Sequence, residues 1–234
     1  MLAKEQKMLK NSRETEYEFS KGLRWTHWIR FFCMIVLITT GFYIAYVFIS
    51  PDVADEPTLF LQAKIRMWHQ IFGFVLIGAT IFKIYLFFFD RSHAGKLERV
   101  SLLDCLSPKI WIAQIKYYLF MGPHPHLRGV YNPLQFVSYI FVYGLLILIS
   151  LTGLILYVHV YHEGLGGALY NIMRYFEALF GGLANVRVIH HICMWGFLIF
   201  VPIHVYMAVF NSIKGKEGAM DAVFSGYKFK KAEH

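Results

Sequence analysis

Charged residues are scarce in this chain of 234 residues. Asp, Glu, Lys and Arg together make up 16% of the sequence, whereas hydrophobic residues make up 57%. An average soluble domain has about 25% charged residues. The composition therefore argues against a soluble domain and favours a membrane protein. The net charge of +8 does not by itself indicate nucleic-acid binding, because in a membrane protein the distribution of basic residues matters more than their sum.

Cysteine is also rare. The three cysteines, Cys33, Cys105 and Cys193, form no C-x-x-C pair, so the sequence suggests neither a zinc site nor an iron–sulfur site. The C-x-x-C-H signature of covalently attached haem is missing too, and nothing indicates a disulfide framework.

Long apolar runs, by contrast, are abundant. Four runs reach the length of about 20 residues that a helix needs to span the hydrocarbon core. The Gly and Pro residues inside them do not argue against helices, because both are tolerated in membrane helices. We expect an all-α integral membrane protein, residues 1–234 forming a single membrane domain, with transmembrane helices at about residues 25–50, 66–89, 133–161 and 186–211.

Lysine and arginine are distributed unevenly between the segments that flank these runs. Seven lie in the N-terminal segment to Arg30, six between the second and third runs and five in the C-terminal tail, but only two in each of the other connections. Because basic residues concentrate on the cytoplasmic side, both termini are predicted to be cytoplasmic. The long basic N-terminal region, with no small-residue cleavage site after the apolar run, is not expected to be a signal peptide. The predicted cytoplasmic segments are residues 1–24, 90–132 and 212–234.

The connection between the second and third runs has a pattern of its own. Its segment SLLDCLSPKIWIAQIKYYLF, residues 101–120, mixes aromatic and aliphatic residues with lysines. This mixture predicts a short amphipathic helix on the cytoplasmic surface, with an ordinary loop packed against the bundle as the alternative.

Four histidines lie at matched depths in the predicted bundle. His27 is near the cytoplasmic start of the first helix, whereas His69 and His190 are near the outer starts of the second and fourth. His204 follows His190 by fourteen residues, about 21 Å along a helix at about 1.5 Å per residue. Since fourteen residues is nearly four full turns, both lie on one face of the fourth helix. We therefore expect His69 to pair with His190 near the outer surface, and His27 with His204 near the inner surface.

Two stacked histidine pairs suit two haem groups, each with two axial imidazole ligands. Imidazole is a common axial ligand of haem iron, and helix bundles hold such cofactors in their interiors. A single intramembrane histidine could instead be a hydrogen-bonded packing residue. Zinc is the other alternative, but two ligands at each level are too few for a closed zinc site.

Arginine precedes three of these histidines by three residues, in the stretches RWTH, RMWH and RVIH. Residues three apart share a helix face, so each guanidinium could reach the propionates of a haem bound by the following histidine. We predict that Arg24 contacts the inner haem, and that Arg66 and Arg187 contact the outer one. The alternative is that these arginines anchor the helices at the membrane interface.

Two of these stretches resemble the signatures of a known family. RWTHWIRFFCMIVLITTG and RVIHHICMWGFLIFVPIH are similar to stretches of the cytochrome b subunit of membrane-bound nickel–iron hydrogenases, to which the gamma subunit of respiratory formate dehydrogenase is related. The resemblance covers about residues 20–212. Val188 departs from the pattern, where a smaller residue is usual. The matching residues of the second stretch are Arg187, Ile189, His190, His191, Trp195, Phe200 and His204.

The resemblance implies a function. His27, His69, His190 and His204 would be the iron ligands of two haem b groups in a protein of the bacterial cytoplasmic (inner) membrane. Electrons would come from hydrogen oxidised by a large nickel–iron subunit and pass through an iron–sulfur small subunit, which brings its own membrane helix. This chain would carry them to quinone, either menaquinone or ubiquinone, and would perform no hydrogen chemistry itself. Its other contacts would be with membrane lipid, and none with nucleic acid.

The resemblance places the quinone near the inner haem. Asn132 and Gln135, in the segment YNPLQ, would contact it, and His124 and His126 could relay the protons that quinone reduction takes up. The alternative is that this segment is a plain turn started by Asn-Pro.

The sequence is compatible with three other functions. The same electron-transfer anchor could serve a formate dehydrogenase, or the chain could act alone as a b561-type superoxide:quinone or ferric oxidoreductase. A transporter with an intramembrane histidine proton relay is the third alternative. The sequence assigns no role to His159, His162 or His191.

Overall fold

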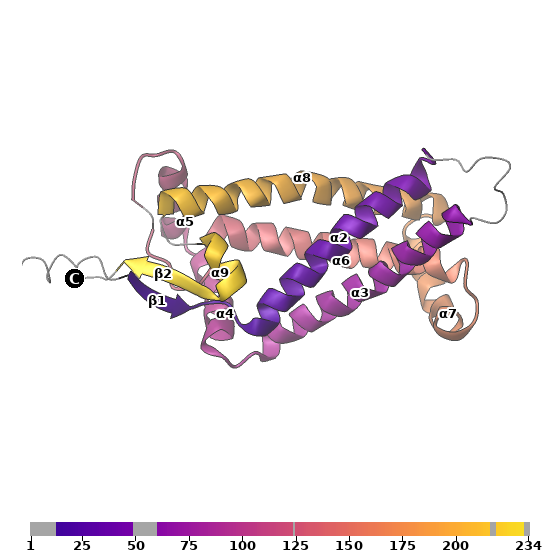
Figure 1. The fold of residues 1–234 in the computed structure, drawn as a ribbon, viewed down its shortest axis with the longest axis horizontal. Coiled ribbons are helices and arrows are strands. Elements are labelled where there is room, and N and C mark those ends of the chain that lie inside the picture. The colour runs from indigo at the N-terminus through magenta and orange to yellow at the C-terminus, as the bar shows by residue number, and fades with distance from the viewer. Residues whose placement is uncertain (1–12, 49–59, 124, 216–218, 232–234) are drawn as a thin grey trace, which may run out of the picture. The chain divides into compact units, whose positions relative to one another are not determined.

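The structure, a computed structural model, describes residues 13–48, 60–123, 125–215 and 219–231. Eight helices and two strands follow one another within these ranges (Figure 1). They are β1 (Arg13–Tyr17), α2 (Lys21–Ala45), α3 (Leu61–Phe89), α4 (His93–Cys105), α5 (Pro108–Tyr118), α6 (Pro133–Val158), α7 (Gly164–Leu179), α8 (Leu183–Gly215), α9 (Ala219–Ser225) and β2 (Tyr227–Lys231).

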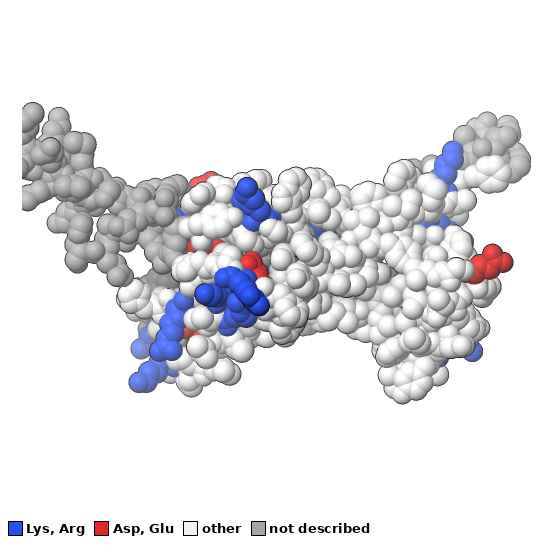
Figure 2. Space-filling model, turned by 90° about the horizontal axis from the view of Figure 1, so that it is seen from below, with Lys and Arg blue, Asp and Glu red and all other residues white. Residues whose placement is uncertain are grey.

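The helices α2, α3, α6 and α8 are long and apolar enough to cross a membrane. Their most apolar windows have mean hydropathies of 1.8, 2.2, 2.4 and 2.0, and none of the four helices contains Asp or Glu. On the face that Figure 2 shows, much of the surface carries neither basic nor acidic side chains. The prediction of a helical protein with four helices long and apolar enough to span a membrane is confirmed.

The chain divides into two compact units, and each of the four long helices contributes to both. Unit 1 comprises Met1–Trp25, Lys83–Phe141 and Phe200–His234, and unit 2 comprises Thr26–Phe82 and Val142–Ile199.

In unit 2, each long helix contributes one residue to a shared buried cluster. The cluster consists of Cys33 from α2, Leu76 from α3, Leu146 from α6 and Phe197 from α8. A second cluster packs α7 against α6 and α8 through Ile155, Val158, Met173 and Val186. Together these clusters hold the helices whose side chains form the candidate site.

Unit 1 contains a two-stranded antiparallel sheet that the sequence did not predict. The strands β1 and β2 pair from Arg13 with Lys231 to Tyr17 with Tyr227, so segments far apart in the sequence lie side by side (Figure 1). Gly226 follows α9 with φ of +90°, and a Cβ there would lie 2.7 Å from the Tyr17 ring. Only glycine fits this conformation and this close approach.

Two helices, rather than one, form in the connection between α3 and α6. The chain breaks between α4 and α5, where Pro108 begins the second helix; proline is favoured at a helix start because it lacks an N–H. The helix α4 buries Ser101 and Asp104. The Asp104 Oδ2 accepts hydrogen bonds from the N–H groups of Arg128 at 2.7 Å and Gly129 at 2.9 Å. The connection therefore fixes the loop that leads into α6.

Candidate functional site

His69 of α3 and His190 of α8 lie next to each other in unit 2. Their ring centroids are 6.3 Å apart and their planes are inclined by 61°. Both side chains are half-buried. The structure thus brings together the two histidines that the sequence assigned to the outer level.

A threonine holds each imidazole at its Nδ1 atom. The Oγ1 of Thr40, on α2, lies 2.8 Å from the Nδ1 of His69. The Oγ1 of Thr152, on α6, lies 2.9 Å from the Nδ1 of His190. All four long helices therefore contribute to one arrangement of two histidines and two threonines.

The hydroxyl hydrogens decide which imidazole nitrogen carries a proton. The Thr40 hydroxyl donates to the carbonyl of Val36 at 2.6 Å, and the Thr152 hydroxyl donates to that of Leu148 at 2.9 Å. Since each hydroxyl has a single hydrogen, its oxygen accepts the hydrogen bond from the histidine. Both Nδ1 atoms are then protonated, and both Nε2 lone pairs are available to a metal ion.

A glycine follows each threonine and lies against the same ring. A Cβ at Gly41 would lie 3.4 Å from the Cε1 of His69, and a Cβ at Gly153 would lie 3.4 Å from the Cε1 of His190. Glycine at these positions keeps the space beside both imidazoles clear. These threonines and glycines were not predicted from the sequence, although the dipeptide Thr-Gly occurs in both the first and the third apolar run.

The spacing of the two rings fits a single metal ion between them. Two imidazoles on opposite sides of one metal have centroids about 6 Å apart, because each metal–nitrogen bond is about 2 Å long. Within the described ranges, no group of three or more His, Cys, Asp or Glu side chains could hold a metal ion. A pair of imidazoles alone suits haem iron, whose four equatorial ligands come from the porphyrin.

Residues 18–226 match the family model of the prokaryotic cytochrome b561. The chain belongs to this family. It is 28% identical over 218 residues to the probable Ni/Fe-hydrogenase B-type cytochrome subunit of Rhizobium leguminosarum bv. viciae, covering 92% of this chain and 89% of that protein. It is 26% identical over 216 residues to the probable Ni/Fe-hydrogenase 1 B-type cytochrome subunit of Escherichia coli (strain K12), covering 92% and 91%. These findings confirm the resemblance read from the sequence, and a b-type cytochrome implies haem b.

The other two histidines predicted to bind haem in this b561-type cytochrome lie in different units. His27, in unit 2, packs edge-on against Trp28 with centroids 5.4 Å apart. His204, in unit 1, stacks on Phe200 with centroids 5.3 Å apart and lies 6.3 Å from the ring of Tyr139. Each histidine thus packs against at least one aromatic ring, and their pairing stays a prediction.

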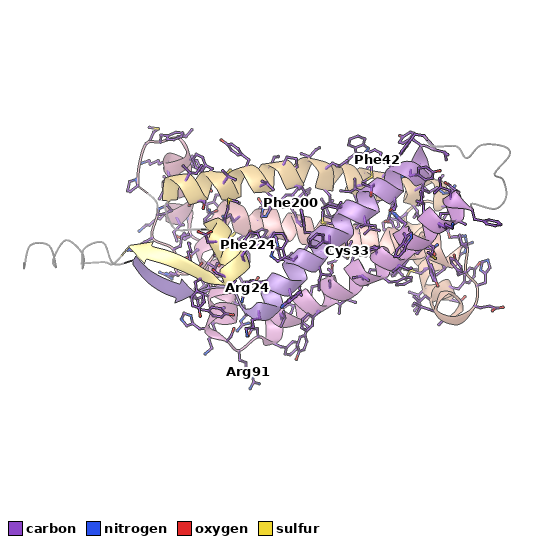
Figure 3. All side chains as sticks on the ribbon, viewed as in Figure 1. Arg24, Cys33, Phe42, Arg91, Phe200 and Phe224 are labelled. Atoms are coloured by element: carbon purple, nitrogen blue, oxygen red, sulfur yellow. The ribbon has the colours of Figure 1, made fainter. Side chains whose placement is uncertain are left out.

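The three predicted propionate partners differ in their surroundings. The Arg24 Nη1 donates a hydrogen bond to the carbonyl of Phe224 in α9, and the two residues lie side by side in Figure 3. Arg66 and Arg187 are exposed near the starts of α3 and α8. Arg24 therefore links the start of α2 to the C-terminal segment, and propionate contacts remain predictions for all three.

The residues predicted to contact quinone form the start of α6. The Oδ1 of Asn132 accepts from the N–H of Gln135 at 2.9 Å, and the Oε1 of Gln135 accepts from the N–H of Asn132 at 3.1 Å. This reciprocal arrangement is a capping box. The Asn132 Nδ2 also donates to the Tyr118 hydroxyl at 3.1 Å. The structure thus gives both residues a local role in starting the helix. His126 is exposed, and the prediction for His124 lies outside the described residues.

The connection between α6 and α8 places one unassigned histidine in a charged cluster. The Oε2 of Glu177 lies 2.7 Å from the Nε2 of His159 and 2.7 Å from the Nη1 of Arg174. Burial alone would raise the pKa of Glu177, but the hydrogen bonds and charges of these two neighbours lower it below its usual value. His162 packs against the Tyr170 ring at 5.9 Å, and His191 is exposed on α8. His159 therefore helps to hold α7 against the end of α6.

Proposed function

We propose that this protein is a di-haem cytochrome b that anchors a periplasmic nickel–iron hydrogenase in the bacterial inner membrane and passes its electrons to quinone. The observation that supports this most directly is the pair His69–His190, with both Nδ1 atoms held by threonines. His69 and His190 would hold the outer haem b, and His27 and His204 the inner one.

Different residues of the chain have different proposed roles in electron transfer. Haem b, when bound, supplies one-electron oxidation and reduction at its iron. The Nε2 atoms of His69 and His190 would hold the iron, while Thr40 and Thr152 fix the orientation of the rings. The apolar helices keep water away from the site, and Arg24, Arg66 and Arg187 would neutralise propionates.

The proposed topology has both termini in the cytoplasm and a single membrane domain over residues 1–234. The lysine and arginine bias supports it, and so does the pairing of β1 with β2, because paired strands must lie on the same side of a membrane. An electron that moves from an outer to an inner haem then works against the membrane potential, at about 2.3 kcal/mol per 100 mV. Reduction of quinone from the cytoplasmic side would store the energy of hydrogen oxidation as membrane potential.

The helices α4 and α5 are proposed to lie at the cytoplasmic surface of the membrane. Both bury polar side chains, such as Asp104 and Gln114, and expose apolar ones, such as Leu103 and Ile112. Buried polar and exposed apolar side chains are the reverse of the pattern in a soluble protein. This pattern suits a helix at a membrane surface, because the exposed apolar side chains can enter the interfacial region of the bilayer. The quinone site, with Asn132, Gln135, His124 and His126, would lie nearby.

The partners would be the iron–sulfur small subunit with its membrane helix and the large nickel–iron subunit. The names of the relatives support this choice. The alternatives are a gamma subunit of formate dehydrogenase and a cytochrome that acts alone. The proteins that bind to this chain distinguish these two alternatives from the proposed hydrogenase subunit.

Purification of the tagged chain from native membranes in mild detergent tests the proposed partners. We expect both hydrogenase subunits to co-purify, and hydrogen to reduce the haems and then a soluble quinone analogue. Formate dehydrogenase subunits in their place would support the first alternative. A chain that purifies alone and still exchanges electrons with quinone would support the second.

A further inference from the structure

Arg30 is a charged residue inside the membrane-spanning helix α2. Its Nη1 donates a hydrogen bond to the hydroxyl of Tyr143 at 2.5 Å, and its Nε donates to the carbonyl of Thr26 at 2.9 Å. The guanidinium carbon also lies 5.3 Å from the centroid of the Tyr143 ring. Two neighbouring groups of unit 2 therefore fix the position of this guanidinium.

Among the residues that the structure describes, no carboxylate pairs with the charge of Arg30. Its described partners, a hydroxyl, a carbonyl and an aromatic ring, are all neutral, and the described helices α2, α3, α6 and α8 contain no Asp or Glu. Lys83, the buried lysine of α3, is instead paired with Glu98 at 2.6 Å. A guanidinium stays protonated in proteins, and a net charge within a membrane is costly and marks a functional position.

The position of Arg30 along α2 relates its charge to one of the two haem levels. It follows His27 by three residues, about 4.5 Å along the axis, and residues three apart share a helix face. It precedes Thr40, which holds the outer ligand His69, by ten residues or about 15 Å. The charge is therefore much closer to the level of His27 than to the outer pair.

We propose that Arg30, held by Tyr143, raises the reduction potential of the haem bound by His27 relative to that of the outer haem. This inference rests on the proposed function. An arriving electron lowers the positive charge of a bis-histidine haem by one, so a fixed positive charge nearby stabilises the reduced form. The effect is strong where the dielectric constant is low. The resulting difference in potential favours transfer from the outer to the inner haem against the membrane potential.

Redox titration of the purified complex carrying Arg30→Gln tests this role. We expect a lower midpoint potential for the inner haem, an unchanged one for the outer haem and two haems per chain. Arg30→Lys keeps the charge and should restore most of the potential, and Tyr143→Phe should give a smaller decrease. The matched control is Arg91→Gln, because Arg91 is exposed outside the spans and points away from the helices in Figure 3; it should change neither potential.

An inner midpoint that is unchanged in Arg30→Gln, or an equal shift of both haems, would overturn the proposal. If Arg30→Gln fails to assemble, the variants Tyr143→Phe and Arg30→Lys test the proposal instead. An unshifted midpoint potential of the inner haem in Tyr143→Phe would overturn the proposal. A midpoint potential of the inner haem in Arg30→Lys far below that of the native protein would overturn it too. The His27→Ala variant identifies the inner haem, because it should retain the outer one alone. A His27→Ala variant that keeps both haems would instead refute the proposed ligands, and with them the basis of this inference.

Discussion

The imidazoles of His69 and His190 lie with ring centroids 6.3 Å apart, and the Nδ1 atom of each is bound to a threonine hydroxyl, which leaves Nε2 as the nitrogen available to a metal ion. The pair joins α3 to α8, while its threonines come from α2 and α6. One site therefore depends on all four long helices, and this arrangement leads to the following predictions.

Replacement of Thr40 or Thr152 by valine should weaken the binding of the outer haem. Valine has a similar shape but removes the acceptor that fixes the histidine tautomer. Loss of such a partner of a metal ligand typically costs about 10–100-fold in affinity. Haem retention during dilution and the midpoint potential of the outer haem measure the effect.

Thr39→Val provides the matched control, because Thr39 is exposed and its hydroxyl bonds only to carbonyls of its own helix. Equal haem retention in Thr39→Val and Thr40→Val would contradict the role given to Thr40.

Gly41→Leu and Gly153→Leu should prevent the outer haem from binding. Even a Cβ at either position would lie 3.4 Å from an imidazole ring, so a larger side chain must displace the ring. Gly144→Leu is the control, since nothing lies within 4 Å of a Cβ at Gly144. Pyridine haemochrome assays should find one haem fewer in the first two variants, and the account fails here if all three variants bind haem alike.

Lys83→Met should destabilise unit 1. The Lys83 Nζ lies 2.6 Å and 2.7 Å from the two carboxylate oxygens of Glu98, and Lys83 is 4% exposed. Removal of one partner of a buried ion pair costs about 3–5 kcal/mol, whereas an apolar replacement of both partners is often tolerated. Thermal unfolding in detergent should therefore find Lys83→Met less stable than the double variant Lys83→Met/Glu98→Leu. The control is Lys96→Met, which changes an exposed lysine of α4 and should have little effect on thermal stability.

Glu177 should make the connection between α6 and α8 sensitive to acid. Its pKa is lower in the folded protein than in the unfolded chain, so its contribution to stability is complete above the unfolded value of about 4.3. The contribution is lost as the pH falls through the lower folded value. Unfolding followed from pH 7 downward should show a steeper loss in the native protein than in Glu177→Gln. The control variant Glu163→Gln, which changes an exposed carboxylate, should behave like the native protein.

Asn132→Asp separates the two roles of Asn132. Aspartate keeps the oxygen that caps α6 but lacks the donor that reaches Tyr118. If Asn132 also contacts quinone through its amide, Asn132→Asp should reduce quinone poorly while retaining both haems. Normal turnover would restrict Asn132 to its capping role.

The sequence predicted the features that depend on local pattern. Apolar runs without acidic residues define the four long helices, and helical periodicity together with depth led to the pairing of His69 with His190. Thr40 and Thr152 were missed because a threonine in a membrane helix commonly bonds to its own backbone, and the distant histidine is identified only by the fold. The sheet was missed for the same reason: Tyr17 and Tyr227 are neighbours only after the chain has folded.

The number of haems and the identity of their ligands decide whether this chain is a di-haem cytochrome b. The purified chain should contain two haem b groups, determined by a reduced-minus-oxidised spectrum and pyridine haemochrome against protein concentration. His69→Ala and His190→Ala should each lose the same haem, and His27→Ala and His204→Ala should each lose the other. One haem per chain, or the loss of the same haem in all four variants, would contradict the account.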